Sequence, residues 1–259
     1  MKNKRPKRKV VLVLVEGQSE INALKPAISA LFDSINPEIE VFFPTIVEDG
    51  CDKRGDITSK YGISADVIEG CIYKLFLKSF FDTEKLYPKD VTEIIQLVDL
   101  DGAYIPNDQI IFGENPNGEE KPYYGENGIL TTDVESMVER NKRKQGNLNY
   151  LSSISEIQVK SKRPKYSIYF FSSNLDHFIH GDANLSVRDK TSKAEEFAAR
   201  YELDPVGFTA VIKATPGALQ NMSYDESWNF IKESDNSIKR YSNINILLDR
   251  LLSQIENGE

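Results

Sequence analysis

Acidic residues follow two short apolar runs of this chain and mark a candidate catalytic site. Glu16 comes directly after residues 10–15, which are all apolar and include four valines. Asp99 and Asp101 come directly after residues 93–98, in the sequence Asp-Leu-Asp-Gly. Runs of this length and composition are typical of strands buried in a parallel sheet. Because ligands of such sheets collect at the carboxyl ends of the strands, we expect the three carboxylates to share one site.

The chemistry that suits these carboxylates is the binding of a divalent cation. Neighbouring strands lie about 4.8 Å apart, so side chains at two strand ends can hold one ion. Mg²⁺ prefers carboxylate, water and phosphate oxygens, and Mn²⁺ is an alternative. If the strand continues through Asp101, both aspartates project to one side and Leu100 points into the core. Glu20, one helical turn after Glu16, is either a further metal ligand or a residue that stabilises a helix N-terminus. The hypothesis requires that these oxygens converge on one cation, and ion pairs that exclude a cation would contradict it.

The two histidines of the chain form a second group of candidate site residues. His177 and His180 are three positions apart, so in a helix they share one face. With Asp176 or Asp182 they have the donor atoms to ligate a transition metal. Helix capping and a general-base role are the alternatives. Asn174 directly precedes this segment, and all of it follows a predicted strand, so we expect it to lie near the carboxylates.

Charge suggests how nucleic acid would be contacted. The net charge of −8 argues against coating of nucleic acid through bulk charge. Local basic clusters could still contact phosphates, although solvent-exposed faces are the simpler interpretation. These clusters comprise Lys2, Lys4, Arg5, Lys7, Arg8 and Lys9, then Arg140, Lys142, Arg143 and Lys144, and finally Lys160, Lys162, Arg163 and Lys165. A polar loop at 48–62, with Asp52, Lys53, Arg54, Asp56 and Lys60, either positions phosphate or is an exposed turn.

The elements that must position these residues alternate between strand and helix. We predict strands at 10–15, 39–43, 93–98 and 166–171, with helices from Ser19, from Ser64 to Phe81 and from Thr132, where Glu135 completes a capping box. Further helices are predicted at 192–201, 205–213, 224–232 and 238–255. This order indicates an α/β fold with a four-stranded parallel sheet flanked by helices and a mainly helical C-terminal extension.

The expected organisation has three parts. Residues 1–8 form a basic N-terminal arm, 9–175 form the α/β core with a long irregular insertion at 103–130, and 176–259 form a helical extension packed on the core. Cys51 and Cys71 lack the spacing of a disulfide framework or a zinc ribbon. The apolar runs are shorter than the roughly 20 residues of a membrane span, and no signal peptide is recognisable, so we expect a cytoplasmic protein without a membrane partner.

The sequence VLVLVEGQSE, with the later strand that ends in Asp-Leu-Asp, resembles the Toprim domain. Toprim domains are the metal-binding cores of topoisomerases, bacterial primases and OLD-family nucleases. The resemblance implies that Glu16 acts as a general acid or base or as a metal ligand, while Asp99 and Asp101 hold Mg²⁺ against a phosphodiester. The segment SSNLDHFIHGD is loosely similar to the corresponding part of RloB-like Toprim proteins. A magnesium-dependent nuclease of DNA or of RNA, including tRNA, with a role in phage defence is therefore implied, acting with a partner protein or as a homo-oligomer.

Two other interpretations remain open. Asp-Leu-Asp-Gly also resembles the first motif of HAD-type phosphatases, in which the first aspartate, here Asp99, would be the nucleophile and Asp101 the general acid. Ala103 replaces the Thr or Val usual in that family, and Glu16 has no role there. The other alternative is a Toprim-like scaffold without catalysis that binds nucleic acid or a partner protein.

Overall fold

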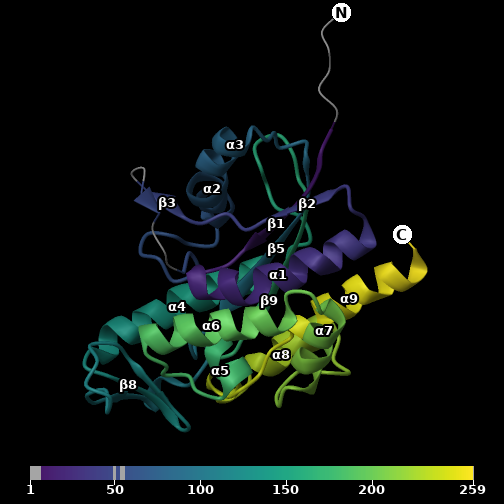
Figure 1. Ribbon diagram of the computed structural model, residues 1–259. Coiled ribbons are helices and arrows are strands. Elements are labelled where there is room, and N and C mark those ends of the chain that lie inside the picture. Colours follow the sequence, from purple (N-terminus) through teal and green to yellow (C-terminus); the bar gives the residue numbers. More distant parts are fainter. Residues whose placement is uncertain (1–6, 49–50, 53–55, 259) are drawn as a thin grey trace, which may run out of the picture.

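The sheet at the centre of the molecule has four parallel strands in the order β2-β1-β5-β9. The structure, a computed structural model, describes residues 7–48, 51–52 and 56–258. The strands are β1 (Lys9–Leu14), β2 (Ile39–Phe42), β5 (Val91–Asp99) and β9 (Lys165–Phe171). All four predicted strands are confirmed, and the arrangement in Figure 1 is an α/β fold consistent with a Toprim-like fold.

The parallel register places the predicted acidic positions at one edge of the sheet. Leu14 at the end of β1 is opposite Gln96 of β5, and Asp99 at the end of β5 is opposite Phe171 of β9. Glu16, two residues beyond Leu14, is thus level with residue 98. The carboxyl ends of the three strands therefore meet at one edge, as the sequence predicts.

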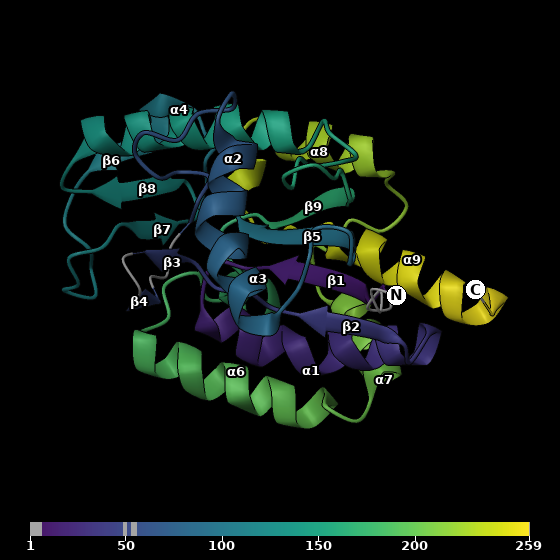
Figure 2. The same cartoon turned by 90° about the horizontal axis from the view of Figure 1, so that it is seen from above.

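Helices cover both faces of the sheet, which explains the continuous apolar run in β1. On one face, Val10, Leu12 and Leu14 pack with residues of four helices: α2 (Ile68–Ile72), α3 (Lys78–Glu84), α4 (Val134–Leu151) and α8 (Tyr224–Ile231). On the other face, Val11, Val13 and Val15 pack with five more: α1 (Gln18–Ile35), α5 (Leu175–His180), α6 (Val187–Tyr201), α7 (Pro205–Ala214) and α9 (Ile244–Asn257). Figure 2 shows α4 and α8 on the side of the sheet opposite to α1 and α6.

Several predicted helix boundaries are wrong by a few residues, and a different side-chain cap explains only the start of α4. Gly17, not Ser19, precedes α1, and the helix continues through Pro26. Asp133, not Thr132, caps α4 by accepting a hydrogen bond from the backbone of Ser136. The helix predicted from Ser64 begins only at Ile68, and a π-helical turn, η1 (Tyr73–Leu77), joins α2 to α3. The last predicted helix divides into the short 3₁₀ helix η3 (Asn236–Ile238) and α9.

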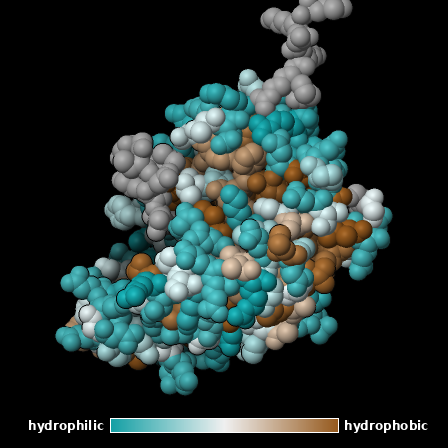
Figure 3. All heavy atoms as spheres, viewed as in Figure 1, coloured by the Kyte–Doolittle hydropathy of each residue, from teal (hydrophilic) through white to brown (hydrophobic). Residues whose placement is uncertain are grey.

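The structure also places the parts of the chain that the sequence left irregular. Residues 47–48 and 51–52 pair as the short strands β3 (Val47–Glu48) and β4 (Cys51–Asp52). Predictions for Lys2, Lys4, Arg5, Lys53 and Arg54 lie outside the described residues, as do the side chains of Cys51 and Asp52. Hydrophilic side chains dominate the face seen in Figure 3, with smaller apolar patches among them. Among the described helices, none combines the length and the apolar character that crossing a membrane requires.

The insertion at 103–130 is more ordered than its turn-rich sequence suggests. It contains the 3₁₀ turn η2 (Asn107–Gln109) and a second, three-stranded sheet of β6 (Ile110–Phe112), β8 (Gly128–Thr131) and β7 (Tyr123–Gly125). Ile110 and Ile129 of this sheet pack with Met137 of α4 and with Ile238. The insertion thus extends the fold beside the carboxyl edge of the main sheet.

Two glycines of the insertion allow a matched test of its packing. Gly128 has φ +154°, and a Cβ at this position would lie 2.1 Å from the carbonyl oxygen of Gln109. Gly118 also has positive φ, but a Cβ there would have no atom within 4 Å. We expect Gly118→Ala to cost about 1 kcal/mol from backbone strain alone, and Gly128→Ala to cost about 3 kcal/mol because strain and overlap add. Chemical denaturation measures both, and equal losses would contradict this packing.

Candidate active site at the carboxyl edge of the sheet

Three carboxylates from three separate segments converge at the carboxyl edge of the sheet. Glu16 follows β1, Asp101 follows β5, and Asp56 comes from the loop before α2. One carboxylate oxygen of each lies within 4.8 Å of the others. The sequence predicted the approach of Glu16 and Asp101, whereas Asp56 was one of several polar residues in an unassigned loop. The cluster is therefore partly predicted and partly new.

Lys144 of α4 lies at the centre of this cluster. Its ammonium is 2.7 Å from Asp101 Oδ2, 2.8 Å from Asp56 Oδ2 and 3.8 Å from Glu16 Oε1. The side chain is 0 % exposed. A buried ammonium is stable only when paired, and here three carboxylates surround it. These carboxylates raise the pKa of Lys144 well above its usual value, although burial acts in the opposite direction.

Burial and Lys144 act in opposite directions on the pKa values of Glu16 and Asp56. Burial and then the neighbouring Asp56 carboxylate raise the pKa of Glu16 well above its usual value, and Lys144 only opposes this. Burial alone would also raise the pKa of Asp56, but attraction and hydrogen bonding to Lys144 outweigh burial and lower it. Close like charges and a single central cation thus give two carboxylates of one cluster opposite shifts.

Asp99 and Asp101 point to different surroundings because the strand ends between them. Asp99 is the last residue of β5, whereas Asp101 has φ +51°, in the left-handed region that few residues other than glycine adopt. The condition for both side chains to share one side, a strand continuing through Asp101, is therefore not met. Leu100 is fully buried in the core, as expected. Backbone strain of this kind is common at functional sites, and here it turns Asp101 toward Lys144.

Asp99 is directed toward the start of α5 rather than into the cluster. Its Oδ1 accepts a hydrogen bond from the backbone N–H of Leu175 at 3.0 Å, and its own N–H donates to Glu16 Oε1 at 3.2 Å. Burial, and then the nearby charge of Glu20, raise the pKa of Asp99 well above its usual value. Asp99 thus links β5, β1 and α5, while its carboxylate lies outside the group formed by Glu16, Asp56 and Asp101.

Glu20 lies with Asp99 in a second acidic group beside the first. Burial is the main cause that raises the pKa of Glu20, and the charge of Asp176 adds to it. Asp176 pairs with Lys190 of α6, whose Nζ is 3.1 Å from Asp176 Oδ2. This pairing raises the pKa of Lys190 against the effect of burial. The predicted metal ligands therefore divide between two neighbouring groups, with Glu16 and Asp101 in one and Glu20 and Asp99 in the other.

Arg140 and Tyr124 complete the surroundings of Asp101. Arg140, one turn before Lys144 on α4, has Nη1 3.8 Å from Asp101 Oδ2 and donates from Nη2 to the backbone oxygen of Asp101 at 2.9 Å. Tyr124 of β7 donates its hydroxyl to Asp101 Oδ1 at 3.3 Å. Burial, and then the charge of Asp101, raise the pKa of Tyr124 above its usual value, so this hydroxyl stays protonated at neutral pH. The insertion therefore contributes directly to the site.

The two histidines lie on α5 but have different neighbours. His177 borders a cavity with Tyr124 and Arg240, whereas His180 contacts the ring of Phe197 and borders a different hollow beside α6. Asn174 caps α5 by accepting a hydrogen bond from the backbone N–H of His177. Asp182 accepts from the backbone of Asn184. Within the described residues, one group of side chains is close enough together to hold a metal ion, and it consists of Glu16, Asp56 and Asp101 without either histidine.

The basic regions of the sequence separate in space. Arg140 and Lys144 line the acidic site, Lys142 is exposed, and the Arg143 guanidinium lies over the ring of Tyr61.

A second basic region lies at the amino ends of β5 and β9, the opposite edge of the sheet. The surface hollow there is bordered by Lys7, Lys89, Lys162, Arg163 and Lys165. Arg8 pairs with Glu40 and Lys9 with Glu38. Tyr104, three residues after Asp101, donates its hydroxyl to Asn149 Oδ1 at 3.0 Å.

The cluster has the donor set of a site for a hard divalent cation. Glu16, Asp56 and Asp101 together offer six carboxylate oxygens. The Lys144 ammonium lies close to two of them, Asp56 Oδ2 at 2.8 Å and Asp101 Oδ2 at 2.7 Å. Three ionised carboxylates against the Lys144 ammonium and the Arg140 guanidinium leave one negative charge, which favours the binding of a cation. Mg²⁺ requires oxygen ligands of this kind, and the identity of the metal follows from no other feature of the described residues. A bound ion must therefore use the carboxylate oxygens that face away from Lys144, or displace its ammonium.

Comparisons with known proteins add nothing to this geometry. The chain matches no protein-family model, no curated protein and no solved structure. What can be said about function therefore depends on the fold and on the cluster of Glu16, Asp56, Asp101 and Lys144.

Removing the buried cation tests the electrostatics of the cluster. Lys144→Met leaves three carboxylates close together without their central charge, and we expect a loss of about 3 kcal/mol at neutral pH. Without Lys144, the pKa of Glu16 rises further above its usual value, and burial raises the pKa of Asp56 with no cation to oppose it. Their protonated forms are then favoured by folding, so the loss shrinks as the pH falls from about 8 to about 5. Denaturation at several pH values measures this.

Lys142→Met is the matched control, because Lys142 is exposed on the same helix. We expect its stability to stay within about 0.5 kcal/mol of the original at all pH values. A pH-independent loss in Lys144→Met would show that packing, and not charge, is the role of Lys144.

Proposed function

We propose that this chain is a divalent-metal-dependent enzyme of Toprim type that cleaves phosphodiester bonds in nucleic acid. The observation that carries the proposal is the convergence of Glu16, Asp56 and Asp101 at the carboxyl edge of a parallel sheet. Mg²⁺ is the proposed ion, and Mn²⁺ a substitute. The similarity of the strand ends to Toprim motifs supports this reaction class, and a role in phage defence is the biological setting that the similarity suggests.

Charge balance supports a phosphodiester as the substrate. Glu16, Asp56 and Asp101 carry three negative charges when ionised, while Lys144 and Arg140 carry two positive charges. A divalent ion and one phosphodiester group together bring one further positive charge. The loaded site would then be neutral, whereas a site without Lys144 and Arg140 would repel the phosphate.

Each side chain has a separate task in this proposal. Glu16, Asp56 and Asp101 would hold the ion, which, when bound, would stabilise charge on the phosphoryl group and lower the pKa of an attacking water. Lys144 keeps Asp56 and Asp101 in place and balances their charge. The Arg140 guanidinium, next to Asp101, would bind a non-bridging phosphate oxygen. The Tyr124 hydroxyl fixes Asp101 from the other side.

Isosteric removal of single charges tests the proposal. We expect Glu16→Gln and Asp101→Asn to reduce cleavage of DNA or RNA oligonucleotides at least 100-fold in the presence of Mg²⁺ or Mn²⁺, because each removes a charged ligand. Calorimetry should show at least tenfold weaker Mn²⁺ binding in both variants. Glu139→Gln and Asp108→Asn are the matched controls. Glu139 is exposed on α4, the helix of Arg140 and Lys144, and Asp108 is exposed seven residues after Asp101. Both variants should leave cleavage and Mn²⁺ binding unchanged.

Three results would contradict this function. A folded wild-type protein that cleaves neither DNA, tRNA nor other RNA with Mg²⁺ or Mn²⁺ would exclude the proposed reaction. Equal Mn²⁺ binding in wild type and Asp101→Asn would favour a scaffold without catalysis. Hydrolysis of phosphate monoesters that survives Glu16→Gln would favour the phosphatase interpretation, in which Glu16 has no part.

A further inference from the structure

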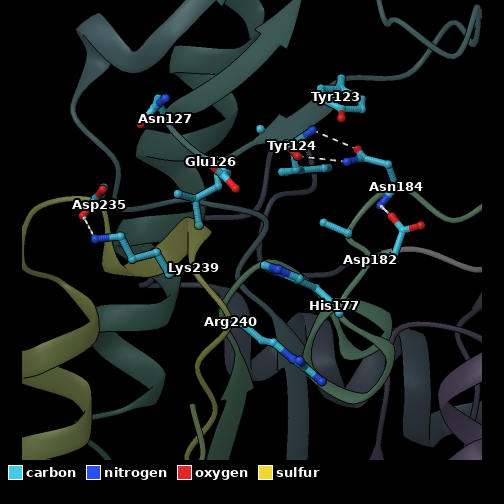
Figure 4. A pocket seen from close by; sticks show the side chains of 14 residues that line it. Tyr123, Tyr124, Glu126, Asn127, His177, Asp182, Asn184, Asp235, Lys239 and Arg240 are labelled. Atoms are coloured by element: carbon cyan, nitrogen blue, oxygen red, sulfur yellow. Dashed lines mark hydrogen bonds and ion pairs between the residues drawn. The ribbon is translucent and has the colours of Figure 1, made fainter. Parts of the chain in front are cut away.

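A cavity of about 630 Å³ lies next to the acidic cluster. It is bordered by the turn between β7 and β8, by residues that end α5 and follow it, and by residues 235–240. Figure 4 shows these segments around one hollow, with His177 between Tyr124 and Arg240. Tyr124 belongs to both regions, because its hydroxyl contacts Asp101 while its side chain lines the cavity. A volume of this size is typical of sites for small molecules.

The hydrogen bonds around His177 determine which ring nitrogen carries the proton. The Ser173 hydroxyl donates its only proton to the carbonyl oxygen of Ile238 at 2.6 Å. Its contact of 3.0 Å with His177 Nδ1 must therefore be a hydrogen bond that Nδ1–H donates. In the neutral ring, Nε2 then carries a lone pair and can only accept. Burial, and then the charge of Arg240, lower the pKa of His177, so the ring is neutral at pH 7.

The charged groups of the cavity make it a poor site for phosphate. Lys239 is paired with Asp235 at 2.7 Å. Arg240 uses Nε and Nη2 to donate to the carbonyl oxygens of Phe178 and Ile179, at 2.9 and 3.0 Å. Glu126 and Asp182 add further negative charge to the lining. Acceptors therefore predominate: His177 Nε2 and these carboxylates suit an uncharged chemical group with N–H donors, and a phosphate attached to that group has to lie outside the cavity.

The rim of the cavity is held rigidly. Asn184 binds the backbone of Tyr124 twice, accepting from its N–H at 2.9 Å and donating to its carbonyl oxygen at 2.8 Å. These bonds, drawn as dashed lines in Figure 4, join β7 to the loop after α5. Tyr123, the residue before Tyr124, also borders the cavity. Aromatic rings commonly stack on nucleobases, so the rim offers a stacking surface beside the acceptors.

We propose that this cavity receives one unpaired nucleobase with an exocyclic amino group, adenine, cytosine or guanine, and that His177 Nε2 accepts a hydrogen bond from it. This inference rests on the proposed function, since it places the base beside the phosphodiester that the acidic cluster would bind. Bases inside a duplex cannot enter such a pocket. The substrate is therefore single-stranded nucleic acid, or a nucleotide turned out of a duplex.

The two histidines allow the proposal to be tested without any cleavage reaction. Nitrogen-15 NMR of the imidazole rings, without divalent metal, should identify Nδ1–H as the tautomer of His177. Adding AMP, CMP or GMP up to about 10 mM should shift the Nε2 resonance of His177 and leave His180 unchanged. UMP, which lacks the amino group, should have a smaller effect, and ribose 5-phosphate should have almost none. His180 thus serves as an internal control on the same helix.

Matched variants complete the test. His177→Phe keeps a ring of similar shape without the acceptor, and we expect it to weaken CMP binding about tenfold, whereas His180→Phe should not change it. An Nε2–H tautomer, no shift of His177 with any nucleotide, or equal shifts with ribose 5-phosphate would each overturn the proposal. These results do not depend on catalysis. An inactive protein whose His177 responds to CMP would contradict the nuclease function alone, and an active protein without this response would contradict the base pocket alone.

Discussion

The ion pairing of Lys144 is the interaction on which the rest of this site depends. A fully buried ammonium must be paired with negative charge, and the carboxylates that pair with Lys144 come from separate parts of the sequence. Glu16 and Asp101 come from two strand ends, and Asp56 from a loop. Without the cation these groups would repel one another in a region of low dielectric constant. Lys144 thus allows an acidic cluster to exist before any metal binds, and any metal that binds must adapt to it.

The main sheet and the insertion have separate tasks around this pairing. Parallel strands bring Glu16 and Asp101 to one edge, and α4, which follows the insertion, places Arg140 and Lys144 against that edge. The insertion contributes Tyr124, which contacts Asp101 and also forms the wall of the neighbouring cavity. One residue therefore joins the proposed metal and phosphate site with the proposed base pocket.

The sequence predicts the sheet well because its signals are local. Short runs of β-branched and aromatic residues identify the four strands, and the acidic residues after two of them mark the edge at which these strands end. The division between Asp99 and Asp101 was not predictable in the same way, because the left-handed backbone of Asp101 depends on contacts of the turn with the end of β9. Asp56 lies among many polar residues of a loop, and nothing local distinguishes it from the others.

The burial of Lys144 was predictable from its position in the helix, but not from its charge. In a run of basic residues it resembles a solvent-exposed lysine. Its position in the helix indicates a buried residue instead. Five buried residues of α4 recur at spacings of three and four: Met137, Asn141, Lys144, Leu148 and Leu151. A polar residue on an apolar stripe of a helix is a candidate for a buried, paired group. Reading α4 as an amphipathic helix would therefore have marked Lys144 as a residue of the site.

The most direct test of the central claim is to locate the metal by anomalous scattering from a crystal soaked in Mn²⁺. We predict a single strong peak at the carboxyl edge of the sheet, within about 2.5 Å of oxygens from Glu16, Asp56 and Asp101. A peak elsewhere, or no peak while Lys144 keeps all its carboxylate partners, would contradict the claim that this cluster is a metal site.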